Sequence, residues 1–152
     1  MKRLAMLQVL LEREQKRRDD AQAVLRNALQ NVQAQQQQAD GLTTYRVEYC
    51  QKWSGQFQQA ASVEILRSYH GFLARLDQAI TQQQSVVAHA GRQADAARQR
   101  LVEREVRVAT VERLIQRRQA LLASAVDRRE QKNMDELAAR LATLRRASSR
   151  HA

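Results

Sequence analysis

The fold is decided by residues 66–125, which read LRSYHGFLARLDQAITQQQSVVAHAGRQADAARQRLVEREVRVATVERLIQRRQALLASA. Apolar residues recur there at alternating steps of three and four, the spacing of positions a and d in a coiled-coil heptad. Only Gln83, Arg104 and Arg118 interrupt this apolar pattern with polar side chains. The a positions are Leu66, Leu73, Ile80, Val87, Ala94, Leu101, Val108, Ile115 and Leu122, and the d positions are Tyr69, Leu76, Gln83, Ala90, Ala97, Arg104, Val111, Arg118 and Ala125. The pattern predicts one long helix that packs along a narrow seam.

The N-terminal third carries a second heptad register. Its a positions are Leu4, Leu11, Arg18, Leu25, Val32, Ala39 and Arg46, and its d positions are Leu7, Glu14, Ala21, Ala28, Gln35, Leu42 and Tyr49. Between the two registers, Gly55 can end a helix in a left-handed conformation and Ser62 can cap the next one. The sequence therefore predicts an all-α fold, a long two-helix antiparallel coiled-coil hairpin. We expect helix one at about 3–53, the bend at about 54–62 and helix two at about 63–147, within a single domain 1–152.

An antiparallel pairing that centres the bend between the registers places Gln35 opposite Ile80 and Gln83 opposite Val32, so these polar seam residues face apolar ones. Helix one then ends opposite about residue 112, which leaves a C-terminal helical overhang of about 35 residues. A single helix cannot bury an apolar stripe by itself, so we expect a partner for the overhang. Its apolar residues are Ile115, Leu121, Leu122, Leu137, Leu141 and Leu144.

The composition agrees with a rod of helices. The 152 residues include no proline, four glycines and only six aromatic residues, and the formal net charge is +10. Such charge permits binding to nucleic acid, membrane surfaces or acidic partners and selects none of them. Cys50 has no second cysteine to pair with, which fits a reducing compartment. The apolar start is short and no stretch approaches the ~20 apolar residues of a membrane span, so we expect a soluble cytoplasmic protein.

The sequence offers little that could carry catalysis. His70, His89 and His151 are far apart and lack the spacing of metal ligands. There is no glycine-rich phosphate loop and no nucleophile beside a plausible base, and two thin helices provide no enclosed pocket. We therefore expect no enzyme activity, no cofactor, no metal site and no small-molecule substrate.

One flank of the predicted hairpin is apolar near the bend. The g positions of two antiparallel helices adjoin, which brings Tyr45 close to Phe72 and Gln38 close to Ala79. The opposite flank is polar or small, with Thr43, Cys50, His70 and Asp77. Exposed rings on a thin rod indicate a protein-binding hot spot. Alternatively, the rings only seal the end of the hairpin against fraying.

The segments LTTYRVEY at 42–49 and YHGFLARLDQAI at 69–80, on either side of the bend, make the chain resemble the flagellar export protein FliJ family. The resemblance implies a small cytoplasmic component of flagellar type III export, peripheral on the inner membrane at the export apparatus and needed for flagellum biogenesis, motility and chemotaxis. Such proteins are similar to the γ stalk of rotary ATPases. They bind the ring of the export ATPase FliI and promote its assembly, dock on the export-gate protein FlhA, and in some cases bind export chaperones.

The resemblance also implies two sets of binding residues. The gate-binding set corresponds to Gln38, Leu42, Tyr45, Tyr49, Phe72, Leu76 and Ala79. A further family position corresponds to Gln83. The family pattern has histidine there, so Gln83 is not included in the gate-binding set. The set expected to bind the ATPase ring is Leu4, Leu7, Leu11, Val111, Leu114, Ile115, Leu121 and Leu122.

Two other functions are open at this stage. A basic coiled coil that binds nucleic acid through Arg140, Arg145, Arg146 and Arg150 predicts tight duplex binding with a steep salt dependence. We favour no nucleic-acid partner, because arginines at a helix C-terminus also complement the helix dipole and no aromatic rings are interleaved with them. A structural rod that self-associates through the overhang predicts concentration-dependent sedimentation.

Overall fold

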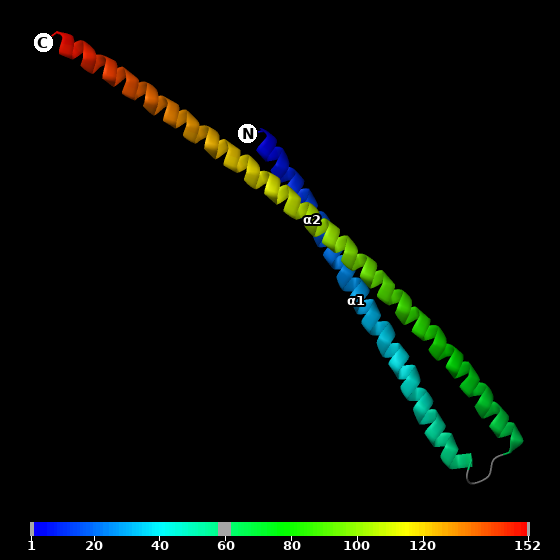
Figure 1. The fold of residues 1–152 in the computed structure, drawn as a ribbon. Helices are drawn as coiled ribbons and strands as arrows, with labels where there is room; N and C mark the ends of the chain where they lie inside the picture. Colours follow the sequence, from blue (N-terminus) through cyan, green and yellow to red (C-terminus); the bar gives the residue numbers. More distant parts are fainter. Residues whose placement is uncertain (1, 58–61, 152) are drawn as a thin grey trace. The chain divides into compact units, whose positions relative to one another are not determined.

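A computed structural model describes residues 2–57 and 62–151, which form two helices, α1 (Lys2–Phe57) and α2 (Val63–Arg150) (Figure 1). The prediction of an all-α, two-helix fold is confirmed. Ser62 caps the N-terminus of α2 as predicted, because its hydroxyl oxygen accepts a hydrogen bond from the backbone N–H of Ile65 at 3.2 Å. Glu64 lies in the first turn, where a negative charge complements the helix dipole.

Helix α1 continues about one turn beyond its expected end near residue 53. Gly55 lies inside the helix and has no positive φ, so the prediction that it ends the helix is wrong. A lone glycine costs a helix only about 1 kcal/mol, which the packing of neighbouring side chains can offset. The remainder of the expected bend, residues 58–61, lies outside the described residues.

The chain divides into two compact units, each of which pairs a segment of α1 with a segment of α2. The bend unit comprises Lys16–Glu105, and the terminal unit comprises the residues up to Gln15 and those from Val106 onward. In the bend unit the two helices lie side by side and antiparallel (Figure 1). That residues 1–152 fold as a single domain remains a prediction.

The predicted seam coincides with the buried face of both helices. Every predicted a and d position is buried or half-buried except Ala125. In the bend unit the most buried seam residues of α2 are alanines, with Ala90 only 2% exposed. Small side chains allow two helices to approach closely, so the bend unit has a thin aliphatic core.

Two polar seam residues of the bend unit hydrogen-bond to each other. The buried Gln83 side-chain amide donates hydrogen bonds to the backbone oxygen of Gln35 at 3.0 Å and to its side-chain oxygen at 2.8 Å. The predicted pairing did not include this contact, and that each glutamine also faces an apolar residue remains a prediction. A buried amide needs hydrogen-bond partners, and the other glutamine supplies them.

In the terminal unit, burial of α2 extends farther than predicted. Ile115 is buried, and Arg118 and Leu122 are half-buried, whereas every residue from 123 to 151 is exposed. The exposed overhang therefore begins about ten residues later than the predicted position near 113. Neither described helix has an apolar stretch that would let it cross a membrane.

Candidate protein-binding surfaces

Five aromatic side chains of the bend unit form a continuous group, here called the bend cluster: Tyr45, Tyr49, Trp53, Tyr69 and Phe72. Tyr49 lies at its centre, with ring centroids 4.6 Å from Phe72, 5.6 Å from Tyr69, 6.1 Å from Trp53 and 6.2 Å from Tyr45. These distances are typical of favourable ring contacts. The cluster thus ties the last turns of α1 to the first turns of α2.

Tyr45 is the exposed member of the bend cluster. Its ring meets Phe72 edge to face at a centroid distance of 6.3 Å, which confirms the predicted neighbours. Tyr45 remains 48% exposed, whereas Phe72 is half-buried. The arrangement presents a large ring on the surface with a second ring holding it in place, which suits a protein-binding anchor.

The seven residues of the expected gate-binding set differ in how far a partner could reach them. Gln38 and Tyr45 are exposed, and Leu42, Phe72 and Ala79 are half-buried. Leu76 is only 7% exposed because it packs in the seam. The seventh residue, Tyr49, is half-buried at the centre of the bend cluster. A partner on this flank would therefore contact Gln38, Tyr45 and the accessible edges of the half-buried members.

Sequence reasoning missed the part of this surface nearest the bend. A hollow of about 510 Å³ is lined by Tyr49, Trp53, Glu64, Ile65, Ser68, Tyr69, Phe72 and Arg75. Trp53 is the next a position after Arg46, a signal that was lost because helix one was expected to end there. Ile65 is 44% exposed and offers a further apolar contact beside the rings.

The opposite flank of the bend unit is polar, as predicted. The Arg46 guanidinium binds the Asp77 carboxylate through Nε–Oδ1 at 2.5 Å and Nη2–Oδ2 at 3.4 Å, and Asp77 raises the pKa of Arg46. Arg46 also donates to the Cys50 sulfur at 3.9 Å. A hydrogen bond to Cys50, reinforced by partial burial, raises the pKa of Tyr69 above its usual value near 10. The described side chains of this flank therefore make polar contacts with one another.

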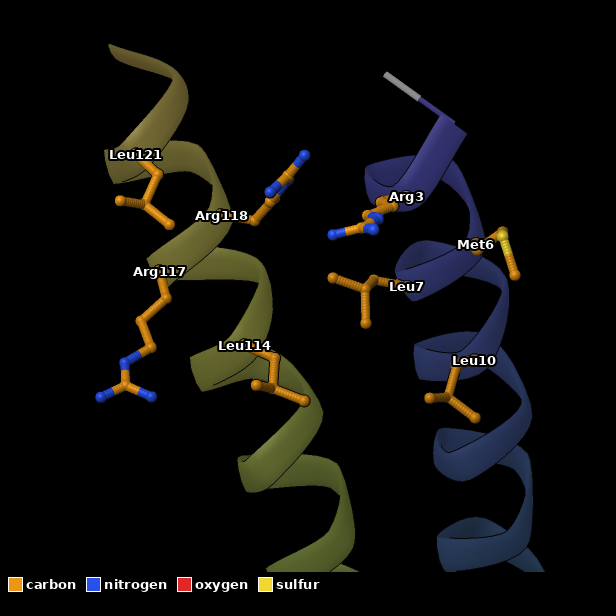
Figure 2. A pocket seen from close by; sticks show the side chains of 8 residues that line it. All are labelled: Arg3, Met6, Leu7, Leu10, Leu114, Arg117, Arg118 and Leu121. Carbon is orange, nitrogen blue, oxygen red and sulfur yellow. The ribbon is translucent and has the colours of Figure 1, made fainter. Parts of the chain in front are cut away.

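The terminal unit contains a second accessible apolar surface, here called the terminal groove. Its volume is about 580 Å³, and Figure 2 shows its lining side chains on facing turns of α1 and α2. The lining residues are Arg3, Met6, Leu7, Leu10, Leu114, Arg117, Arg118 and Leu121. None of the described residues that line the groove is acidic, so it combines aliphatic surface with positive charge.

Three of the eight residues expected to bind the ATPase ring, Leu7, Leu114 and Leu121, line this groove. Val111 and Ile115 are buried. The remaining three, Leu4, Leu11 and Leu122, are half-buried in the seam. The structure therefore brings part of the expected set to an open surface and uses the rest as the core beneath it.

The groove residues that sequence reasoning missed are Arg3, Met6, Leu10, Arg117 and Arg118. A signal existed, because Arg3, Leu10, Leu114 and Leu121 all fall at g, the heptad position that identified Tyr45 and Phe72. Within the described part of the chain, the buried Nε of Arg118 has no hydrogen-bond partner. In the same part of the chain, no group of three His, Cys, Asp or Glu residues could hold a metal ion.

Comparison with known proteins gives one family. The model of a family described as "Flagellar FliJ protein" matches residues 2–147, nearly the whole chain. No curated protein and no solved structure matches the chain.

Proposed function

Because the chain belongs to the FliJ family of flagellar proteins, we propose that it couples the export ATPase FliI to the export gate FlhA in type III secretion. Family membership makes the chain a component of flagellar protein export that associates with the export apparatus. In this proposal the chain acts by binding and carries out no catalysis. It works on the cytoplasmic side of the inner membrane, and export chaperones are further partners.

The observation that carries the proposal is the presence of two accessible apolar surfaces that share a heptad position. Tyr45 and Phe72 lie at g in the bend unit, and Leu10, Leu114 and Leu121 lie at g in the terminal unit. Monomeric soluble proteins rarely expose groups of large apolar side chains without a partner. Two separate surfaces suit a protein that holds two partners.

The bend cluster is the surface we assign to FlhA. Its exposed Tyr45 is preorganised by contacts with Tyr49 and Phe72, which lowers the entropy lost when a partner covers it. Tyr is among the residues that most often dominate binding free energy at protein interfaces. Gln38 and Ala79 extend the surface along the same flank.

The terminal groove is the surface we assign to the FliI ring. Its aliphatic lining can receive apolar side chains, and Arg3, Arg117 and Arg118 favour an acidic surround on the partner. Leu10 and Leu121 are 38% and 63% exposed, so the groove is accessible without unfolding of the helices.

Two paired variants test the proposal. Tyr45→Ala/Phe72→Ala should weaken FlhA binding at least 100-fold and leave stimulation of FliI unchanged, since hot-spot truncations cost about 2 kcal/mol or more each. Leu10→Ser/Leu121→Ser should leave FlhA binding unchanged and abolish the increase in FliI ring assembly and ATP turnover.

The matched controls truncate exposed apolar side chains that lie outside both surfaces. Val47→Ala/Val63→Ala serves the bend unit, and Val102→Ser/Val106→Ser serves the groove, because all four valines are 49–72% exposed. Wild-type FlhA affinity in the Tyr45/Phe72 variant would refute the gate assignment. No effect of the wild-type chain on FliI assembly or turnover would refute the ATPase assignment.

A further inference from the structure

The overhang of α2 carries a narrow apolar stripe that the hairpin does not use. Met134, Leu137, Leu141 and Leu144 follow one another at steps of three, four and three, which places them on one helix face. They are 66%, 54%, 53% and 65% exposed. The stripe begins about three turns after the last half-buried residue, Leu122.

This stripe does not continue the seam. If the a and d positions are counted past Leu122, they fall on exposed residues without a large apolar side chain: Ala125, Arg129, Lys132, Glu136, Ala139, Thr143, Arg146 and Arg150. The leucines lie instead at other heptad positions and therefore on another face of the helix. The stripe is thus separate from both the seam and the terminal groove.

Charge on the overhang is arranged around the stripe. Residues 134–150 contain Arg140, Arg145, Arg146 and Arg150, and their two acidic residues, Asp135 and Glu136, lie at the start of the segment beside Met134. At 3.6 residues per turn, Arg140 lies on one side of the leucines and Arg145 on the other, whereas Arg146 and Arg150 point away from them. Arginine stems can extend an apolar face while their guanidinium groups reach toward phosphates.

We propose that residues 134–150 of α2 bind the surface of an anionic lipid membrane as an interfacial amphipathic helix. The leucines enter the boundary between headgroups and acyl chains, and the flanking arginines bind lipid phosphates. A second copy of residues 137–150 fits poorly, because the two arginines that flank the leucines, Arg140 and Arg145, would meet the same arginines of the other copy. A nucleic acid would neutralise the arginines but leave the leucines in water. The inference rests on the overhang alone and does not depend on the proposed partners FliI and FlhA.

Vesicle co-sedimentation of the full chain tests the proposal. The chain should bind vesicles of phosphatidylcholine with phosphatidylglycerol and dissociate from them as the salt concentration is raised. It should not bind vesicles of phosphatidylcholine alone. Arg140→Gln/Arg145→Gln should weaken binding roughly 30-fold, the combined effect of two basic residues at an anionic surface. The control Arg128→Gln/Arg129→Gln removes the same charge from the overhang before the stripe and should retain most of the affinity.

The apolar contribution needs its own variant. Leu141→Ser/Leu144→Ser should also lose vesicle binding, whereas Val106→Ser, which changes an exposed apolar residue outside the overhang, should not. Circular dichroism at 222 nm checks that each variant keeps its helix. Equal losses in the Arg140/Arg145 and Arg128/Arg129 variants would indicate attraction by net charge alone and would overturn the proposal.

Spin labels locate the face that enters the lipid. In a Cys50→Ser chain, a label at Ser148→Cys lies on the leucine face, one turn beyond Leu144, and a label at Ala139→Cys lies on the opposite face. Anionic vesicles should raise the oxygen accessibility of the first label and leave the second in water. Capture of the stripe by an acidic coiled-coil peptide, with no affinity for vesicles, would assign it to a protein partner and overturn the lipid proposal.

Discussion

The bend cluster and the terminal groove are both apolar surfaces on helix flanks, yet they differ in how they are built. In the bend unit, five rings contact one another and leave mainly Tyr45 and Ile65 accessible. In the terminal unit, separate aliphatic side chains line an open space of about 580 Å³ whose polar members are arginines. Both surfaces have a hollow, but the first is built of rings that contact one another, whereas the second is built of separate aliphatic side chains.

The two surfaces should therefore differ in how much they contribute to the stability of the free chain. Rings that contact each other contribute to the folded state before any partner arrives, so loss of a central ring should destabilise the bend unit. Leucines that line the terminal groove are only partly buried in the free chain, so each should contribute less to its stability than a ring at the centre of the bend cluster. Four measurements on the free chain test this difference between the two surfaces.

The largest effect is expected for Tyr49→Ala, which removes the ring that contacts Tyr45, Trp53, Tyr69 and Phe72. The free energy of unfolding should fall by about 2–3 kcal/mol, somewhat less than for a fully buried ring. Fluorescence of Trp53, the one tryptophan of the chain, reports unfolding of the bend unit directly in a urea titration.

The matched control for this prediction is Leu10→Ala, a truncation of a partly exposed leucine in the terminal groove. It should change the free energy of unfolding by no more than about 1 kcal/mol. Equal losses for Tyr49→Ala and Leu10→Ala would remove the distinction between a surface of rings in mutual contact and one of separate aliphatic side chains.

A smaller effect of opposite sign is expected for Arg118→Met in the terminal groove. Within the described residues, the buried Nε of Arg118 lacks a hydrogen-bond partner, and its replacement by an apolar side chain of similar length removes that cost. The chain should become more stable by about 1 kcal/mol in a thermal or urea unfolding experiment. Destabilisation would show that the guanidinium contributes more to the free groove than its geometry indicates.

An alkaline titration tests the bend unit again. The pKa of Tyr69 is raised in the folded chain by its hydrogen bond to Cys50 and by partial burial. The stabilisation tied to the neutral phenol is therefore fully present below about pH 10, the unfolded value, and is lost as the pH rises through the higher folded value. The melting temperature of the wild-type chain should fall above pH 10, and Tyr69→Phe should reduce that dependence.

The smallest effect is expected for Asp77→Asn on the polar flank. Arg46 and Asp77 form an exposed ion pair, and such pairs contribute little because water and salt screen them. The variant should melt slightly below the wild-type chain at low salt and indistinguishably from it at 1 M salt, where the screening length is about 3 Å. A large loss at high salt would mean that the flank, and not the bend cluster, holds the helices together.

The faces of the helices could be predicted from the sequence, but their axial alignment could not. The heptad pattern identified the buried positions because an apolar step of three and four defines a stripe on a helix. Sliding one helix by seven residues leaves every a and d residue on the same face. The pattern therefore did not reveal that Gln35 and Gln83 meet, or that burial continues to Leu122.

The bend and the terminal groove show two further limits. Gly55 can end a helix but does not have to, and Trp53 continues the heptad through the expected end, so the local glycine signal was overestimated. The terminal groove was predicted only in part, because Leu7, Leu114 and Leu121 belong to the expected ATPase-binding set whereas its arginines and Met6 carry no motif. Leu10 could have been found by applying to residues 3–10 the flank argument used for Tyr45 and Phe72.

The hydrogen bonds between Gln83 and Gln35 have a consequence for the rings near the bend. If the two helices slipped by seven residues, the two glutamines would move apart by about 10 Å and Gln83 would lose both acceptors in a buried position. Leucines could tolerate such a slip, because other leucines would replace their neighbours. The amide pair cannot, and so it selects which turn of α2 lies beside Tyr49. The aromatic surface near the bend therefore depends on an amide contact about four turns away along α1.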